Sequence, residues 1–213
     1  MAGKAVSQTY DQWLRRDDVD AVAAMCRFFT QDDPVHQTLR GIAAKLDELR
    51  IAYAVAGGMA LAAHHFVRAT VHIDILVTAA GLAAIHQELE GLGYVPPFAG
   101  SKNLKDVSTG VGIEFLVTGQ FPGDGKPKPV AFPDPAQSAI EIGGIRYLRL
   151  STLLELKLAS GMTNPGRLKD LADAQELIRI LKLPRDFTRQ LNSFVQNKFD
   201  ELWQGVANFP GDE

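Results

Sequence analysis

The sequence predicts an α+β fold in which helices cover a mixed β-sheet, with more helices before and after it. Two observations lead to this prediction. In the first half of the chain, short apolar runs of strand length alternate with longer runs of helical periodicity, which is typical of a sheet covered by helices. After residue 150 the periodicity is helical. We therefore divide the chain into an N-terminal helical extension (1–33), an α/β core (34–150) and a C-terminal helical region packed on that core (151–213).

The elements before residue 94 follow from apolar spacing and from signals that mark helix ends. Residues 7–29 carry apolar side chains at mostly helical spacing, which predicts one or two added helices. Asp33 and Pro34 mark the next helix start, because Asp caps a helix and Pro fits its first turn. The elements expected after this helix are a strand over 51–56, a helix over 57–66, a strand over 71–77 and a helix over 80–92.

Strands and turns dominate the rest of the predicted core. Gly110-Val111-Gly112 and Gly143-Gly144 are turn signals, and each predicts a hairpin. The stretch 119–135 holds five prolines and three glycines, which predicts an irregular loop, and such long loops are often functional. Its Lys126 and Lys128 either meet phosphate groups or belong to a solvated linker. The remaining expected elements are strands over 106–109, 113–117, 140–142 and 145–150, and helices over 151–159, 167–181 and 185–204.

The composition indicates one sizeable core and a small substrate. The 213 residues are 46% hydrophobic, which suffices to bury a core without disulfides or a structural metal. A net charge of −3 gives no general basic field for holding long nucleic acid. Cys26 is the single cysteine and the chain begins without an apolar signal core, so we expect a cytoplasmic protein. We expect no membrane span, because no apolar segment is long enough.

Charged residues within two apolar strands indicate a cation site. His72 and Asp74 are two positions apart, so both project from one face of their predicted strand. Glu114 lies between apolar residues of another predicted strand, where a charge is costly unless it meets a cation. If these strands are neighbours, Asp74 and Glu114 can converge on Mg²⁺, which takes carboxylate and phosphate oxygens. The alternative is that the two carboxylates pair with nearby basic residues such as Arg68.

Two longer patterns resemble a known protein family. The first comprises Gly57-Gly58, a helix, Arg68-x-Thr70 and the strand segment Ile73-Asp74-Ile75-Leu76-Val77, with the later strand acid Glu114. The second comprises the run from Ser151 to Ala159 and the segment Arg167-Leu168-Lys169-Asp170-Leu171-Ala172-Asp173. Over roughly residues 36–181, this order is similar to the nucleotidyltransferase superfamily with the polymerase-beta-type core, and within it to the abortive-infection type.

The resemblance implies roles for the matching residues. Gly57 and Gly58 would face the triphosphate, where backbone donors and a helix terminus favour anions. The implied metal ligands are His72, Asp74 and Glu114, and the implied catalytic residues are Asp74, Glu114 and Lys157. The implied nucleotide-binding residues are Gly57, Gly58, Arg68, Thr70, Lys157 and Asp170. Asp170 or Asp173 would complete the rim, although the spacing of Arg167, Asp170 and Asp173 fits a surface ion-pair ladder equally well.

His72 departs from the family pattern, which has a carboxylate at this position. Imidazole suits zinc, nickel or copper better than magnesium, so we expect Mg²⁺ or Mn²⁺ to bind weakly. The resemblance implies transfer of a nucleotidyl group from a nucleoside triphosphate to an unknown acceptor, which is a small molecule, an RNA or a protein.

Two other functions stay open at this point. One is a degenerate, noncatalytic nucleotide-binding or regulatory module of the same fold, of toxin–antitoxin or phage-defence type, which the histidine favours. The other is an interaction protein that uses its terminal helices, which is favoured if exposed faces carry Trp13, Phe194 or Trp203 as an apolar patch.

Overall fold

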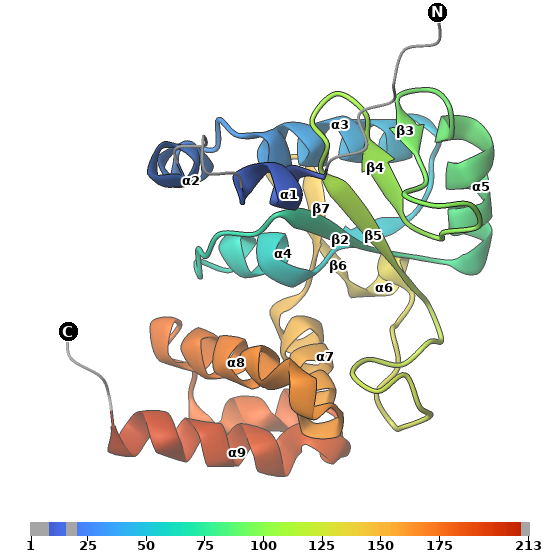
Figure 1. Cartoon of the computed structure of the whole chain (residues 1–213). Helices are drawn as coiled ribbons and strands as arrows, with labels where there is room; N and C mark the ends of the chain where they lie inside the picture. Colours follow the sequence, from blue (N-terminus) through green and yellow to red (C-terminus); the bar gives the residue numbers. More distant parts are fainter. Residues whose placement is uncertain (1–8, 16–20, 210–213) are drawn as a thin grey trace, which may run out of the picture.

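Seven strands of the described residues form one mixed sheet at the centre of the molecule (Figure 1). The computed structural model describes residues 9–15 and 21–209. The strand order across the sheet is β3-β4-β5-β2-β1-β7-β6. The strands are β1 (Tyr53–Val55), β2 (His72–Val77), β3 (Tyr94–Val95), β4 (Leu104–Asp106), β5 (Gly112–Val117), β6 (Ala139–Ile142) and β7 (Ile145–Leu148).

Helices precede, cover and follow this sheet. The α-helices are α1 (Tyr10–Leu14), α2 (Ala21–Phe29), α3 (Pro34–Glu48), α4 (Gly57–Ala63), α5 (Ala79–Leu89), α6 (Pro135–Ser138), α7 (Leu150–Thr163), α8 (Leu168–Ile180) and α9 (Ser193–Asn208). Two short 3₁₀ turns, Pro165–Arg167 and Arg185–Gln190, lie before α8 and α9. None of the helices in the described part of the chain is long and apolar enough to cross a membrane.

The sheet separates two hydrophobic cores, and β1 contributes to both. Tyr53 and Val55 pack into the core that contains α3 and α5, whereas Ala54 packs into the core that contains α7, α8 and α9. This alternation follows from the two-residue period of a strand. Figure 1 shows α7, α8 and α9 gathered on the same side of the sheet. The predicted α+β class, with helices over a mixed sheet, is confirmed, while the exact domain boundaries stay predictions.

The pairing of β2 brings the candidate cation ligands together. This strand runs antiparallel to β1 and parallel to β5. In the β2–β5 register, Asp74 lies opposite Glu114 and His72 lies opposite Gly112. The expectation that the strands of Asp74 and Glu114 are neighbours is therefore confirmed.

Four elements differ from the sequence prediction, each for a local reason. β4 ends at Asp106, because its carboxylate accepts hydrogen bonds from the backbone and hydroxyl of Ser108 and so forms a turn over 107–110. The helix predicted over 185–204 is interrupted at Asn192, whose side chain caps α9. Asp134 caps the short α6 in the same way. The two residues of β3 are too few to show a period.

Candidate active site

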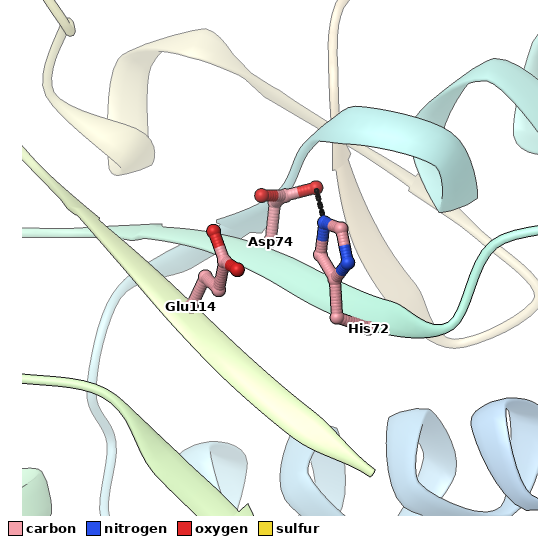
Figure 2. A group of neighbouring side chains, drawn as sticks. All are labelled: His72, Asp74 and Glu114. Carbon is pink, nitrogen blue, oxygen red and sulfur yellow. Dashed lines mark ion pairs between the residues drawn. The ribbon is translucent and has the colours of Figure 1, made fainter. Parts of the chain in front are cut away.

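Three side chains of β2 and β5 form a compact group with metal-ligating atoms. One ligand atom from each of His72, Asp74 and Glu114 lies within 4.8 Å of the other two (Figure 2). His72 Nε2 is 3.5 Å from Asp74 Oδ2. The side chain of Asp74 is 17% exposed and that of His72 is 34% exposed, while Glu114 is exposed. The group is thus anchored on two paired strands and is open to solvent at Glu114.

The carboxylates control the charge of the histidine. The polar contact with Asp74 raises the pKa of His72 above its ordinary value of 6.5, and the negative charge of Glu114 acts in the same direction. Burial and the positive charge of Lys169 oppose this effect but do not cancel it. A metal ion that takes Nε2 as a ligand therefore competes with a proton, whose binding the carboxylates favour.

The donor set determines which metals fit these three residues. One imidazole nitrogen and two carboxylates form a mixed nitrogen and oxygen set. Imidazole suits first-row transition metals, and carboxylates suit Mg²⁺ and Mn²⁺. The group therefore fits a divalent cation that accepts both donor types, such as Mn²⁺, better than it fits Mg²⁺, which favours oxygen.

The two glycines that begin α4 allow its first turn to lie against β2. Gly57 has a φ of +56°, and a Cβ atom there would be 1.8 Å from Asp74 Oδ2. A Cβ on Gly58 would be 2.9 Å from the Cβ atom of Thr70. The Thr70 hydroxyl in turn donates a hydrogen bond of 3.2 Å to the backbone oxygen of His72. Thr70 therefore packs against the start of α4 and holds the start of β2. Its contact with a nucleotide stays a prediction.

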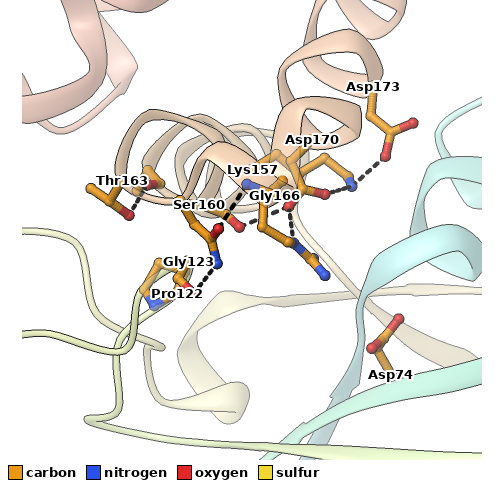
Figure 3. A network of polar contacts seen from close by, with 12 residues as sticks. Asp74, Pro122, Gly123, Lys157, Ser160, Thr163, Gly166, Asp170 and Asp173 are labelled. Carbon is orange, nitrogen blue, oxygen red and sulfur yellow. Dashed lines mark hydrogen bonds and ion pairs between the residues drawn. The ribbon is translucent and has the colours of Figure 1, made fainter.

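A cleft of about 410 Å³ lies between the sheet and the helical region. Gly57 and Asp74 line it from the sheet side, and Lys157, Arg167 and Asp170 line it from the helical side. Figure 3 shows the Asp74 carboxylate across from the polar network of α7 and α8. Of the residues predicted to converge, Gly57, Asp74 and Lys157 line this cleft. Gly58 and Glu114 are not among its lining residues. Asp74 is the residue that belongs to both the cleft and the metal-ligating group.

The helical wall of the cleft is a buried ion network. Lys157 Nζ lies 3.1 Å from Asp170 Oδ1 and 2.6 Å from Asp173 Oδ2. Asp173 also accepts two hydrogen bonds from Arg68, at 2.9 and 3.0 Å. Asp170 accepts a further bond of 2.8 Å from Arg167. Arg68 therefore pairs with Asp173 on α8, which differs from the alternative that it neutralises the carboxylates of the sheet.

Burial separates this network from the surface ladder considered as an alternative. The side chains of Lys157, Asp170 and Asp173 are each at most 7% exposed. Burial tends to raise the pKa of Asp170, but the charge of Lys157 and the hydrogen bond from Ser160 outweigh it, so this pKa lies below its ordinary value of 3.8. The surface-ladder interpretation is therefore wrong, because two of its three members are buried and bound to a buried lysine.

Sequence reasoning missed several residues that line the cleft. Lys102, Phe121 and Asn164 are among them. Lys102 and Asn164 stand outside regular elements, so no periodicity marks them. The length of the loop over 119–135 was the sequence signal that could have indicated residues of this kind, and its residues 120–123 do line the cleft.

The two lysines of this loop differ in their surroundings. Lys126 is exposed and does not line the cleft. Lys128 is only 5% exposed, and its ammonium binds the backbone oxygen of Pro122 and the carboxylate of Asp124, both at 2.5 Å. Lys128 therefore holds the shape of the loop rather than offering a free charge to phosphate.

The aromatic residues considered for an interaction surface are packed at the C-terminal end. Phe194 and Trp203 are half-buried against the core of α7, α8 and α9. The Trp203 ring donates a hydrogen bond of 2.8 Å to the backbone oxygen of Leu183. The side chain of Trp13 lies outside the part of the chain that the structure describes. Phe194 and Trp203 thus do not provide the exposed apolar patch that would favour the interaction hypothesis.

Comparison with known proteins gives a distant likeness at the level of solved structures. No protein-family model matches the chain, and no curated protein matches it. The crystal structure of ANT(2")-Ia in complex with adenylyl-2"-tobramycin is 12% identical, with a TM-score of 0.49, and the match covers 80% of this chain and 97% of that chain. The solution structure of the antibiotic-resistance factor ANT(2'')-Ia is 13% identical, with a TM-score of 0.48, covering 80% of this chain and 92% of that chain. At this distance the function has to be argued from the site itself.

Proposed function

We propose that this chain is a metal-dependent nucleotidyltransferase that transfers a nucleotidyl group from a nucleoside triphosphate to a hydroxyl of an acceptor. The observation that carries the proposal is the position of Asp74. Its carboxylate belongs to a group of three metal-ligating side chains and also lines a cleft with basic residues on its opposite wall. A cation at one end of a partly basic cleft is the arrangement that a polyphosphate ligand requires.

In the proposed reaction, His72, Asp74 and Glu114 would hold a divalent cation, which would supply charge neutralisation for the acceptor oxygen and the leaving pyrophosphate oxygen. The acceptor oxygen forms a bond to the α-phosphorus, the bond between the α- and β-phosphates breaks, and pyrophosphate leaves. Glu114 is exposed and takes the proton of the acceptor hydroxyl.

The cleft would hold the triphosphate. Gly57 brings its backbone against Asp74, and Ala56 before it offers no side-chain acceptor to the amides of the first turn of α4. The amide of Gly57, which lines the cleft, would donate to the phosphates, while the role implied for Gly58 stays a prediction, because Gly58 is not part of the lining. Lys102 and Arg167 line the cleft as further cations. Lys157 is bound to two carboxylates, so we assign it a positioning role that fixes Asp170 and the wall around it.

The acceptor class and the biological setting are further parts of the proposal. The acceptor is a small molecule, an RNA or a protein that reaches the exposed side of the metal-ligating group. Abortive infection, in a phage-defence or toxin–antitoxin system of the cytoplasm, is the setting that the sequence resemblance implies. The single cysteine fits such a reducing compartment.

One observation favours a second candidate, a noncatalytic nucleotide-binding or regulatory module of the same fold. His72 stands where the resembling family has a carboxylate, and the imidazole lies 3.5 Å from the Asp74 carboxylate. When it is protonated, the ring neutralises part of the charge that would attract a hard cation. In this case nucleotide binds in the cleft, but no transfer occurs.

Calorimetric titration with Mn²⁺ and Mg²⁺, with and without a nucleoside triphosphate, tests the proposal. We expect the wild type to bind Mn²⁺, and Asp74→Asn and Glu114→Gln to weaken this binding. Glu141→Gln is the matched control, because Glu141 is exposed on β6 and outside the cleft. Release of pyrophosphate in the presence of candidate acceptors then separates the two candidate functions. Unchanged metal binding in Asp74→Asn and Glu114→Gln would refute the metal site.

A further inference from the structure

The cleft has apolar lining residues that the phosphate and metal chemistry does not use. They are Leu116, Phe121, Phe132, Leu148, Leu153 and Leu156. Phe132 and Leu153 also pack into the core that contains α7, α8 and α9. Phe121 is half-buried and is not among the residues of either hydrophobic core in the described part of the chain. Of the two phenylalanines in the lining, Phe121 is therefore the one whose ring is not part of a core.

The backbone next to Phe121 is held in place from two sides. Asn164 donates a hydrogen bond of 3.1 Å to the backbone oxygen of Gly123. Gly123 has a φ of +76°, and a Cβ there would be 2.3 Å from Thr163 Oγ1, so the loop lies directly against the end of α7. Figure 3 shows Pro122 and Gly123 beside Ser160 and Thr163. On the other side, the buried Lys128 binds the backbone oxygen of Pro122.

We propose that Phe121 is the stacking surface for the base of the bound nucleotide, and that Lys128 is the positioning residue that holds this surface in the cleft. The inference rests on the proposed function and deepens it, because it divides the cleft into a polar end for phosphates and an apolar end for a planar ring. Stacking on an aromatic ring tolerates every base, so we expect little preference among the four nucleotides. A pre-organised loop also reduces the entropy lost on binding.

The placement of Glu114 determines which ligand takes the apolar end. Glu114 is exposed and lies outside the lining of the cleft, so an acceptor can approach the metal-ligating group from the solvent side. The cleft, which begins at Asp74, is then left for the nucleotide. Its volume of about 410 Å³ lies within the range of about 300–1,000 Å³ that small-molecule sites occupy.

The test compares two ligands that share the phosphates and differ in the ring. In the presence of Mn²⁺, binding of the four ribonucleoside triphosphates and of inorganic tripolyphosphate is measured by calorimetry. We expect Phe121→Ala to weaken binding of the nucleoside triphosphates about 5- to 150-fold, which is the affinity that one base stack contributes. Binding of tripolyphosphate should be unchanged. Phe121→Trp should retain the affinity. Phe98→Ala, at a phenylalanine that is 69% exposed outside the cleft, is the control.

Lys128→Met tests the positioning role. We expect it to weaken nucleotide binding selectively, as Phe121→Ala does, whereas Lys126→Met, at the exposed lysine of the same loop, should have no effect. Circular dichroism checks that both variants keep the fold. Equal nucleotide affinity in the wild type, Phe121→Ala and Lys128→Met would overturn the inference while leaving the proposed function intact. Parallel loss of tripolyphosphate binding would overturn it too, and failure of the wild type to bind either ligand would overturn both proposals.

Discussion

The close approach of Gly57 to Asp74 gives a prediction whose magnitude follows from the structure. Replacing Gly57→Ala introduces two costs. An alanine at a φ of +56° occupies the left-handed region, which costs about 1–2 kcal/mol. Its Cβ would also stand 1.8 Å from Oδ2, 2.7 Å from Cγ and 3.1 Å from Cβ of Asp74, so that the carboxylate has to move. Overpacking of this kind adds about 1–3 kcal/mol.

Gly143 separates the two costs. It has a φ of +59°, almost the same as that of Gly57, but a Cβ there would meet nothing within 4 Å. Gly143→Ala therefore carries the backbone cost alone. We expect Gly57→Ala to lower the free energy of unfolding by about 1–3 kcal/mol more than Gly143→Ala does.

Urea denaturation measures this difference, and Mn²⁺ titration gives an independent check. Because Gly57→Ala displaces the Asp74 carboxylate, it should weaken metal binding, whereas Gly143→Ala should not. If the two variants are equally destabilised and bind the metal as tightly as the wild type, the contact between Gly57 and Asp74 does not shape the site.

Three more predictions concern single side chains. His72→Asp should strengthen Mg²⁺ binding in calorimetry, because a charged oxygen ligand replaces an imidazole. If the wild type shows metal-dependent nucleotidyl transfer and this variant loses it, the interpretation of His72 as a weak ligand is refuted. Lys157→Met should lower the free energy of unfolding in urea by at most about 3–5 kcal/mol, because it removes the cation held between two buried carboxylates while Arg68 and Arg167 still contact them, whereas Lys45→Met, at a surface pair, should cost at most about 1 kcal/mol. Burial raises the pKa of Glu155, so its contribution to stability is present at low pH and is lost as the pH rises from its ordinary value of 4.5 through the raised value. Glu155→Gln should therefore gain stability relative to the wild type across this interval, and parallel stability curves would contradict the assignment.

The sheet could be predicted from the sequence because its central strands carry strong local signals. The strand predicted over 71–77 is apolar on one face and carries two polar residues on the other, and it matches β2 (His72–Val77) closely. The sequence made the convergence of Asp74 and Glu114 conditional on their strands being neighbours, and the parallel register of β2 and β5 fulfils this condition. The two-residue period of a strand determines which face a side chain occupies, so the polar residues on one face indicated where the candidate site lies.

The partners of the buried charges could not be predicted, because they are far apart in sequence. Arg68 and Asp173 are separated by 105 positions, and nothing local in either segment selects the other. Spacing on α8 indicated that Asp170 and Asp173 share a face, but it could not show that this face is buried against α7. Lys102 gave no signal for a related reason, since its place in the cleft depends on how the core and the helical region pack together.

The charge balance of the buried network explains how the helical wall of the cleft can be both stable and attractive to anions. Arg68, Lys157 and Arg167 supply three positive charges, and Asp170 and Asp173 supply two negative charges, so one positive charge remains. The carboxylates remove the cost of burying Lys157, which is 7% exposed, and they fix its position. The excess charge is then carried by Arg167, whose side chain is 46% exposed and lines the cleft. Because Asp170 holds Arg167 by a contact of 2.8 Å, the guanidinium is already oriented, and less entropy would be lost if it bound the proposed phosphate.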